Sequence, residues 1–163
     1  MELRKRLSSK YIFVGVYIVA FLIYIIYGLQ PAEASASYEV VGKVSVPQIG
    51  LVADVTKLEI ENGKLNTPDT IVGSYTRSEN KTLLIGHATG VFRDLNQVRI
   101  GDTIKYDNTE YKVTKLTYAV KEAIGMDELL EPADNDTLVV MTCAGKMLSG
   151  GDATHRLIVT AEK

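Results

Sequence analysis

Few residues of this sequence can do covalent acyl chemistry: there is one cysteine, Cys143, and there are two histidines, His87 and His155. A cysteine attacks a carbonyl carbon as the thiolate, so it needs a neighbouring base or cation that favours this form. Lys146 and Arg156 are the cations near Cys143 in the sequence. A lone cysteine is equally compatible with a small core hydrophobe. The elements that position these residues decide between a nucleophile and an inert thiol.

Cys143 ends the run Thr137–Cys143, which is rich in valine and leucine and therefore predicts a buried strand. The cysteine is expected at the C-terminal end of this strand, where a loop begins, and the two small residues that follow leave space around its sulfur. His87 follows the apolar strand 81–85 and has glycines before and after it, so it too is predicted at a strand end.

Arg156 and His155 lie at the start of the last predicted strand, Arg156–Thr160. Successive side chains of a strand point to opposite faces. If Leu157 faces the core, His155 is drawn inward into a structural role and Arg156 lies on the other face. This alternation allows His87, Cys143 and Arg156 to converge at one end of the domain.

The sequence pattern of the chain beyond the first 37 residues is typical of an all-β protein. Eight short strands are predicted at 40–46, 49–55, 58–60, 81–85, 103–107, 110–120, 137–143 and 156–160. The strands at 103–107 and 110–120 are joined by a tight turn and predict a hairpin. Only residues 125–130 and a turn at 92–95 suggest short helices. Short strands with frequent turns are typical of a sandwich or a closed barrel.

The N-terminal region predicts a membrane anchor. Tyr11–Leu29 is a run of 19 residues without a charge, which as a helix would span roughly 28 Å, close to the bilayer core of about 30 Å. Four basic residues precede it, so the positive-inside rule places residues 1–10 in the cytoplasm. Residues 11–29 are then a transmembrane signal-anchor, residues 30–37 a linker and residues 38–163 an extracellular catalytic domain.

A cleaved signal peptide is the alternative, because small residues allow cleavage after Ala34 or Ala36. The apolar run is longer than an ordinary signal-peptide core, which favours the anchor. In either case the domain is exported to the outer side of the cell membrane.

Composition limits the functions of the exported part. The chain has 163 residues and a formal net charge of −2, so one domain is expected and nucleic acid is not an expected partner. Residues 1–30 hold four bases and one acid, which leaves 14 basic and 19 acidic residues in the remainder, a net charge of −5. A single cysteine cannot form an internal disulfide. An exported unpaired thiol is either buried or used, and this favours a nucleophile.

An ordered set of motifs carries a resemblance to a known family. The set consists of I-G-H-A-T-G around His87, then Phe92, Leu95 and Gly101–Asp102, then M-T-C-A-G around Cys143, and H-R-L-I-V-T-A around Arg156. It resembles the sortases, membrane-anchored cysteine transpeptidases of Gram-positive-type bacteria, over residues 44 to 161. The spacing of 13 positions from Cys143 to Arg156 suits this family.

The resemblance implies a closed eight-stranded β-barrel and a role for each site residue. Cys143 would attack the Thr–Gly carbonyl of a Leu-Pro-x-Thr-Gly-like sorting signal of a surface protein. His87 would act as the acid and base, Arg156 would bind the substrate backbone or the oxyanion, and Thr142 would contribute to substrate binding. An amine of a peptidoglycan precursor or a pilin lysine would accept the acyl group. No cofactor is implied, and no metal-ligand spacing is visible.

One departure from the family pattern leaves the sortase class open. The signature T-L-x-T-C falls on residues 139–143, where this chain has V-V-M-T-C. Residues 67–75 are similar to a lead-in of some non-housekeeping classes, such as classes D, E and F. Two other functions are compatible with the sequence besides acyl transfer. The same cysteine could catalyse hydrolysis, or the chain could be a non-catalytic anchored β-domain that binds a cell-wall component.

Overall fold

The computed structural model describes residues 17–21, 38–58, 60–61, 64–65, 67, 70–148 and 152–163. The chain divides into two units, Met1–Ser37 and Tyr38–Lys163. In the first unit residues 17–21 are helical, and the rest of the predicted anchor and linker lies outside the described residues. No helix in the described part of the chain has both the length and the apolar character needed to cross a bilayer. The anchor therefore stays a prediction.

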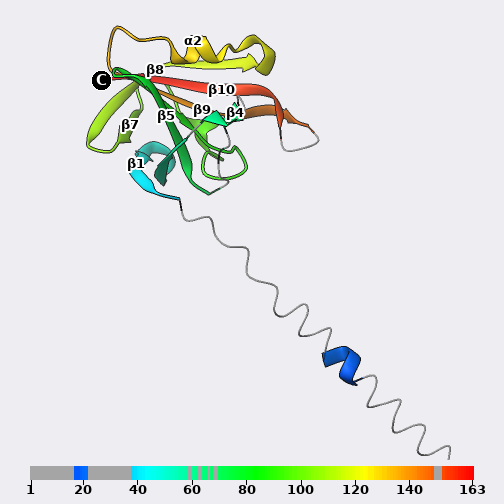
Figure 1. Cartoon of the computed structure of the whole chain (residues 1–163). Helices are drawn as coiled ribbons and strands as arrows, with labels where there is room; N and C mark the ends of the chain where they lie inside the picture. The colour runs from blue at the N-terminus through cyan, green and yellow to red at the C-terminus, as the bar shows by residue number, and fades with distance from the viewer. Residues whose placement is uncertain are drawn as a thin grey trace, which may run out of the picture. The chain divides into compact units, whose positions relative to one another are not determined.

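The second unit is a closed β-barrel (Figure 1). Its strands are β1 (Val40–Val46), β2 (Leu51–Lys57), β5 (Val72–Ser78), β6 (Lys81–Ile85), β7 (Thr103–Tyr106), β8 (Thr109–Val120), β9 (Thr137–Met147) and β10 (Ala153–Glu162). Around the barrel they follow the order β1-β2-β5-β6-β9-β10-β8-β7, and β7 pairs with β1 to close it. The prediction of a closed, eight-stranded, all-β domain is confirmed.

Short elements decorate this barrel. They are the two-stranded sheet of β3 (Ile60–Glu61) and β4 (Lys64–Leu65), the 3-10 helices η1 (Pro47–Ile49), η2 (Leu95–Gln97) and η3 (Lys121–Ala123), and helix α2 (Met126–Leu130). Helix α2 confirms the short helix predicted at 125–130. The hairpin predicted from the turn at 107–109 is confirmed as the antiparallel pair β7–β8.

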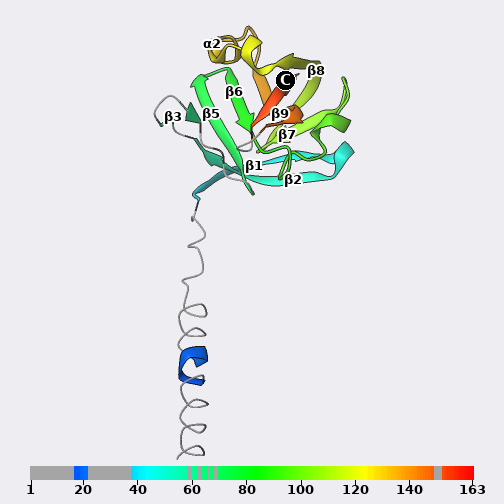
Figure 2. The same cartoon turned by 90° about the vertical axis from the view of Figure 1, so that its right-hand side faces the viewer.

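Two of the strand pairs are parallel, β2 with β5 and β6 with β9. A parallel pair needs a long crossover connection, and the one between β6 and β9 contains the whole β7–β8 hairpin. As a result β6, β9 and β10 lie next to one another although β6 is far from the other two in sequence (Figure 2). Strands β9 and β10 carry Thr142, Cys143 and Arg156, and β6 leads to His87.

Strand β9 is buried on both faces, which explains its continuous apolar sequence. Leu138 and Val140 belong to the cluster inside the barrel. Val139 and Met141 belong to a second cluster, which also contains Leu129 and Leu130 of α2 and Ile158 of β10. Helix α2 therefore covers part of the outer face of β6, β9 and β10.

Two sequence predictions need correction. Strand β9 continues four residues beyond Cys143, to Met147, so the cysteine lies within the strand rather than at its end. Strand β5 is absent from the predicted strands, because residues 72–78 alternate poorly. The helical turn predicted at 92–95 is confirmed: the Leu95 amide donates to the Phe92 carbonyl at 3.2 Å, and the turn continues into η2 at Leu95–Gln97.

Candidate active site

Cys143 and Arg156 are cross-strand partners. In the antiparallel β9–β10 pair, Cys143 is opposite Arg156, Thr142 is opposite Leu157 and Met141 is opposite Ile158. Directly opposed residues of an antiparallel pair have Cβ atoms about 4.5–5.5 Å apart and point to the same face. The cysteine is free and partly exposed. The Arg156 side chain, at 15% exposure, is largely buried.

The parallel pair β6–β9 brings His87 to the same level. Its register runs from Lys81 opposite Thr137 to Ile85 opposite Met141, and two further residues along it are His87 and Cys143. The ladder is extended by two contacts past Ile85: the Gly86 amide donates to the Met141 carbonyl at 3.3 Å, and the buried Thr142 hydroxyl donates to the Gly86 carbonyl at 2.8 Å. Cys143 therefore has Arg156 opposite it on β10, and on its other side lies the segment after β6 that carries His87.

Strand alternation places Cys143 and Arg156 on the outer face of the barrel. Met141 and Ile158 belong to the outer cluster, and Cys143 and Arg156 are each two residues from one of them, so they share that face. Leu157, by contrast, packs against the inner cluster. The prediction that Leu157 faces the core and Arg156 the opposite side is confirmed. Ile85 also packs against the outer cluster, so it lies on the same face as Met141 and Ile158.

His87 is held by the segment that leads into β5. Its Nε2 lies 2.8 Å from the carbonyl oxygen of Thr67. Because a carbonyl oxygen only accepts hydrogen bonds, Nε2 carries a proton in this contact. The backbone after His87 turns sharply, since its carbonyl accepts bonds from both Gly90 and Phe92. Gly86 is required there, because a Cβ at this position would lie 2.6 Å from the Phe92 ring.

Arg156 is fixed by a carboxylate and two backbone carbonyls. One Nη2 hydrogen is donated to Asp152 Oδ1 at 2.7 Å, and Nη1 donates to the carbonyls of Ala153 and His155, both at 3.0 Å. Lys121 forms a second ion pair with the same carboxylate. The hydrogen bond from Lys121 and then that from Arg156 hold the pKa of Asp152 well below its usual range.

A β-bulge separates the site from the end of the hairpin. The register shifts between Ala153 opposite Met147 and His155 opposite Ala144, and Gly145 in the bulge has a φ of 77°. His155 stacks on Tyr118 with ring centroids 4.8 Å apart. This stacking indicates a structural role for His155. Lys146 is exposed, and its backbone amide donates to the Thr154 hydroxyl at 3.0 Å.

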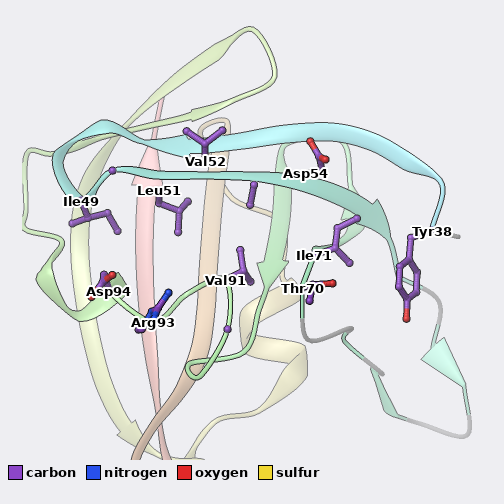
Figure 3. Close-up of a pocket in the computed structure, with 13 residues that line it drawn as sticks. Tyr38, Ile49, Leu51, Val52, Asp54, Thr70, Ile71, Val91, Arg93 and Asp94 are labelled. Atoms are coloured by element: carbon purple, nitrogen blue, oxygen red, sulfur yellow. The ribbon is translucent and has the colours of Figure 1, made fainter. Parts of the chain in front are cut away.

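A separate cavity of about 620 Å³ opens on the β2 side of the barrel (Figure 3). Strand β2 forms one wall and residues 90–94 the other, with Thr70 and Ile71 between them. His87, Thr142, Cys143 and Arg156 are not among the described residues that line it. Within the described part of the chain there is also no group of three or more His, Cys, Asp or Glu side chains placed to hold a metal ion.

Comparisons with known proteins identify the family. The Sortase domain profile matches residues 44–163, so the chain belongs to the sortase family, whose members are cysteine transpeptidases. Sortase C1 from Streptococcus suis is similar, with 26% identity and a TM-score of 0.57 over 77% of this chain and 73% of that one. No curated protein sequence gives a significant match.

Two further solved structures share the fold at lower identity. Sortase C from Clostridium perfringens has 24% identity and a TM-score of 0.57, covering 76% of this chain and 69% of that one. Sortase A from Listeria monocytogenes has 19% identity and a TM-score of 0.59, covering 76% and 86%. Since the similar structures include both sortase A and sortase C enzymes, the class stays open.

The sequence patterns did not single out Asp152 or Lys121. Asp152 lies in a stretch predicted only as a loop, and Lys121 directly follows a long strand. The one available signal was an acidic residue four positions before Arg156. That spacing has a meaning on a helix, but none on the strand that was predicted there.

Proposed function

We propose that this protein is a membrane-anchored sortase that cleaves a Leu-Pro-x-Thr-Gly-like sorting signal and transfers the surface protein to an amine outside the cell. The observation that supports the proposal is the register that pairs Cys143 with Arg156 across β9–β10, together with the β6–β9 pairing that ends two residues before His87. The acceptor is an amine of a peptidoglycan precursor or a pilin lysine. Residues 11–29 anchor the chain, with the N-terminus in the cytoplasm.

In the first half-reaction Cys143 Sγ attacks the carbonyl carbon of the threonine in the Thr–Gly bond. The carbonyl oxygen becomes an oxyanion, which the guanidinium of Arg156 stabilises with hydrogen bonds and positive charge. The C–N bond then breaks, and protonated His87 gives its proton to the leaving glycine amine. The product is a thioacyl enzyme and a free C-terminal fragment.

In the second half-reaction the acceptor amine attacks the thioacyl carbon, and His87 takes the proton that the nitrogen loses. The carbon–sulfur bond breaks, a new amide forms, and Cys143 leaves as the thiolate. The cycle needs no oxidant, and it returns His87 and Cys143 to their starting forms. Thr142 supports the site through its hydroxyl bond to the Gly86 carbonyl, which keeps the strand bearing Cys143 in register with the strand that leads to His87.

The test uses the full chain in mild detergent, because residues 11–29 are apolar. A quenched peptide containing Leu-Pro-x-Thr-Gly is incubated with and without a small primary amine, and the products are identified by mass spectrometry. We expect an amine-linked product with the wild type and none with Cys143→Ala. Cleavage that is indifferent to the amine would assign the protein as a hydrolase. An intact peptide together with a thiol that resists alkylation would favour a non-catalytic binding domain.

A further inference from the structure

Asp152 occupies the junction between the candidate site and the barrel end. Its carboxylate receives hydrogen bonds from Arg156 at 2.7 Å and from its neighbour's amide, Ala153 N, at 2.8 Å. Lys121 pairs with the other carboxylate oxygen, and the Asp152 carbonyl accepts a bond from the Leu148 amide at 2.7 Å. Both the side chain and the backbone of this residue are therefore fixed.

We propose that Asp152 is a positioning residue for Arg156, and that Lys121, the first residue of η3 directly after β8, holds Asp152 in place. This role rests on the proposed function, because Asp152 affects transfer only through Arg156. It adds two residues, Lys121 and Asp152, which are linked in series to Arg156, to the three residues that react with or bind the substrate.

The direction of the guanidinium supports this role. An arginine opposite Cys143 has a long side chain with about 2 kcal/mol of rotamer entropy, so register alone does not fix its head group. Three of its five N–H donors have partners among the described residues: one on Asp152 and two on backbone carbonyls. This leaves Nε–H and one Nη2 hydrogen for a substrate oxygen beside Cys143.

The burial gradient supports it as well. The Arg156 side chain is 15% exposed, whereas those of Asp152 and Lys121 are 36% and 43% exposed. A cation that is largely withdrawn from water needs a paired anion. Asp152 supplies that anion, and the more exposed Lys121 pairs with the same carboxylate. The second ion pair keeps the Asp152 carboxylate in place beside Arg156 when the substrate binds.

The opposite role is the main competitor. If Asp152 instead occupied the donors that the substrate needs, it would act as an internal inhibitor, and removing its charge would raise activity. The two roles predict changes of opposite sign for the same substitution.

The experiment compares Asp152→Asn, Asp152→Glu and Lys121→Ala in the full chain, using the quenched peptide and amine. We expect Asp152→Asn to lower kcat by about 10- to 100-fold, as expected for a displaced catalytic group, with KM for the peptide changed less than about 3-fold. Asp152→Glu should recover part of the loss, and Lys121→Ala should lose less than Asp152→Asn. Glu110→Gln, which breaks an exposed ion pair with Lys105 on another hairpin, is the matched control and should be silent.

A double substitution separates positioning from general stabilisation. In an Arg156→Ala background, Asp152→Asn should cause no further loss, whereas a structural role would give losses that multiply. Multiplying losses, or a faster Asp152→Asn enzyme, would overturn the proposal. Equal melting temperatures establish that each variant is folded.

Nuclear magnetic resonance gives a readout that does not depend on activity. In the wild type, the Nη hydrogens of Arg156 should be resolved and slow to exchange, and they should merge in Asp152→Asn, with Arg156→Lys used to assign the signals. Unchanged Arg156 signals in Asp152→Asn would overturn the positioning role. If the wild type transfers no peptide but these signals behave as expected, the proposed function fails and the Asp152–Arg156 relationship stands.

Discussion

Cys143 and Arg156 face each other directly across the β9–β10 pair. A single strand register thus sets the positions of the candidate nucleophile and the candidate oxyanion donor along the sheet. A shift of the hairpin by one residue would send one of them to the opposite face of the sheet. The direction of the guanidinium is fixed separately, by Asp152 and two backbone carbonyls.

The first prediction concerns the shape of the arginine head group. Arg156→Lys keeps the positive charge but loses the planar fork of donors, so kcat/KM should fall by about 100-fold, the scale seen when one oxyanion donor is removed. The kcat/KM of Arg156→Ala should fall at least as far. Both are measured with the peptide-transfer assay, with circular dichroism to verify folding. Near-normal rates in Arg156→Lys would mean that charge alone suffices.

The second prediction concerns the Thr142 hydroxyl, which donates to the Gly86 carbonyl at 2.8 Å in a buried setting. Thr142→Val preserves the shape and removes the donor, so the free energy of unfolding should drop by about 1–3 kcal/mol. Transfer should slow as well, because this bond ties the residue before Cys143 to the residue before His87. Urea denaturation measures the first effect. Thr142→Ser retains the hydroxyl and is expected to retain most of the activity, and a Thr142→Val protein as stable as the wild type would contradict the prediction.

The third prediction separates backbone strain from crowding at the bulge. Gly145 has a φ of 77°, and a Cβ there would lie 2.7 Å from both His155 Nδ1 and Thr154 Oγ1. Gly50 has a φ of 65° with nothing within 4 Å of such a Cβ. Gly50→Ala should therefore cost about 1–2 kcal/mol from the left-handed backbone alone. Gly145→Ala should cost more and should also slow transfer, and equal melting temperatures for the two variants would refute the crowding argument.

The fourth prediction concerns alkaline stability. Burial, followed by the nearby Asp136 carboxylate, raises the pKa of Tyr111 to about 12. Between the ordinary tyrosine pKa of about 10 and this value the native protein keeps a proton that the unfolded chain has lost. Stability from this group is therefore complete below pH about 10 and falls above it, by up to about 1.4 kcal/mol per pH unit.

Tyr111→Phe provides the control, because phenylalanine has no proton to lose. Chemical denaturation at a series of alkaline pH values should show a difference between the two proteins that shrinks as the wild type loses this contribution. A constant difference across that range would show that the Tyr111 phenol titrates alike in both states.

Much of the fold and part of the site followed from local sequence. The valine-rich run of β9 predicted a buried strand because it packs on both faces, and the alternation of Leu157 with Arg156 predicted the face of the arginine. Strand β5 escaped detection because residues such as Gly73 and Ser74 are buried without being apolar. A glycine is needed there, since a Cβ would lie 2.3 Å from Leu58.

The Asp152–Arg156 pair could not be found in this way. It depends on a bulge that shortens β10 relative to β9 and brings the start of β10 back toward the site. Lys121 joins it because β8 pairs with β10 on the other side. These relationships arise from the barrel closure, which has no local signal in the sequence.

The parallel pairing of β6 with β9 also sets when the protein can become reactive during its synthesis. Leu83 and Val139, which are paired, are 56 positions apart, and such long-range pairing forms slowly compared with local hairpins. Strands β9 and β10 fill the gap between β6 and β8, so the barrel closes only after β10 has been synthesised. Until then the thiol lacks its arginine, and a half-made chain carries no complete site that could attack other proteins.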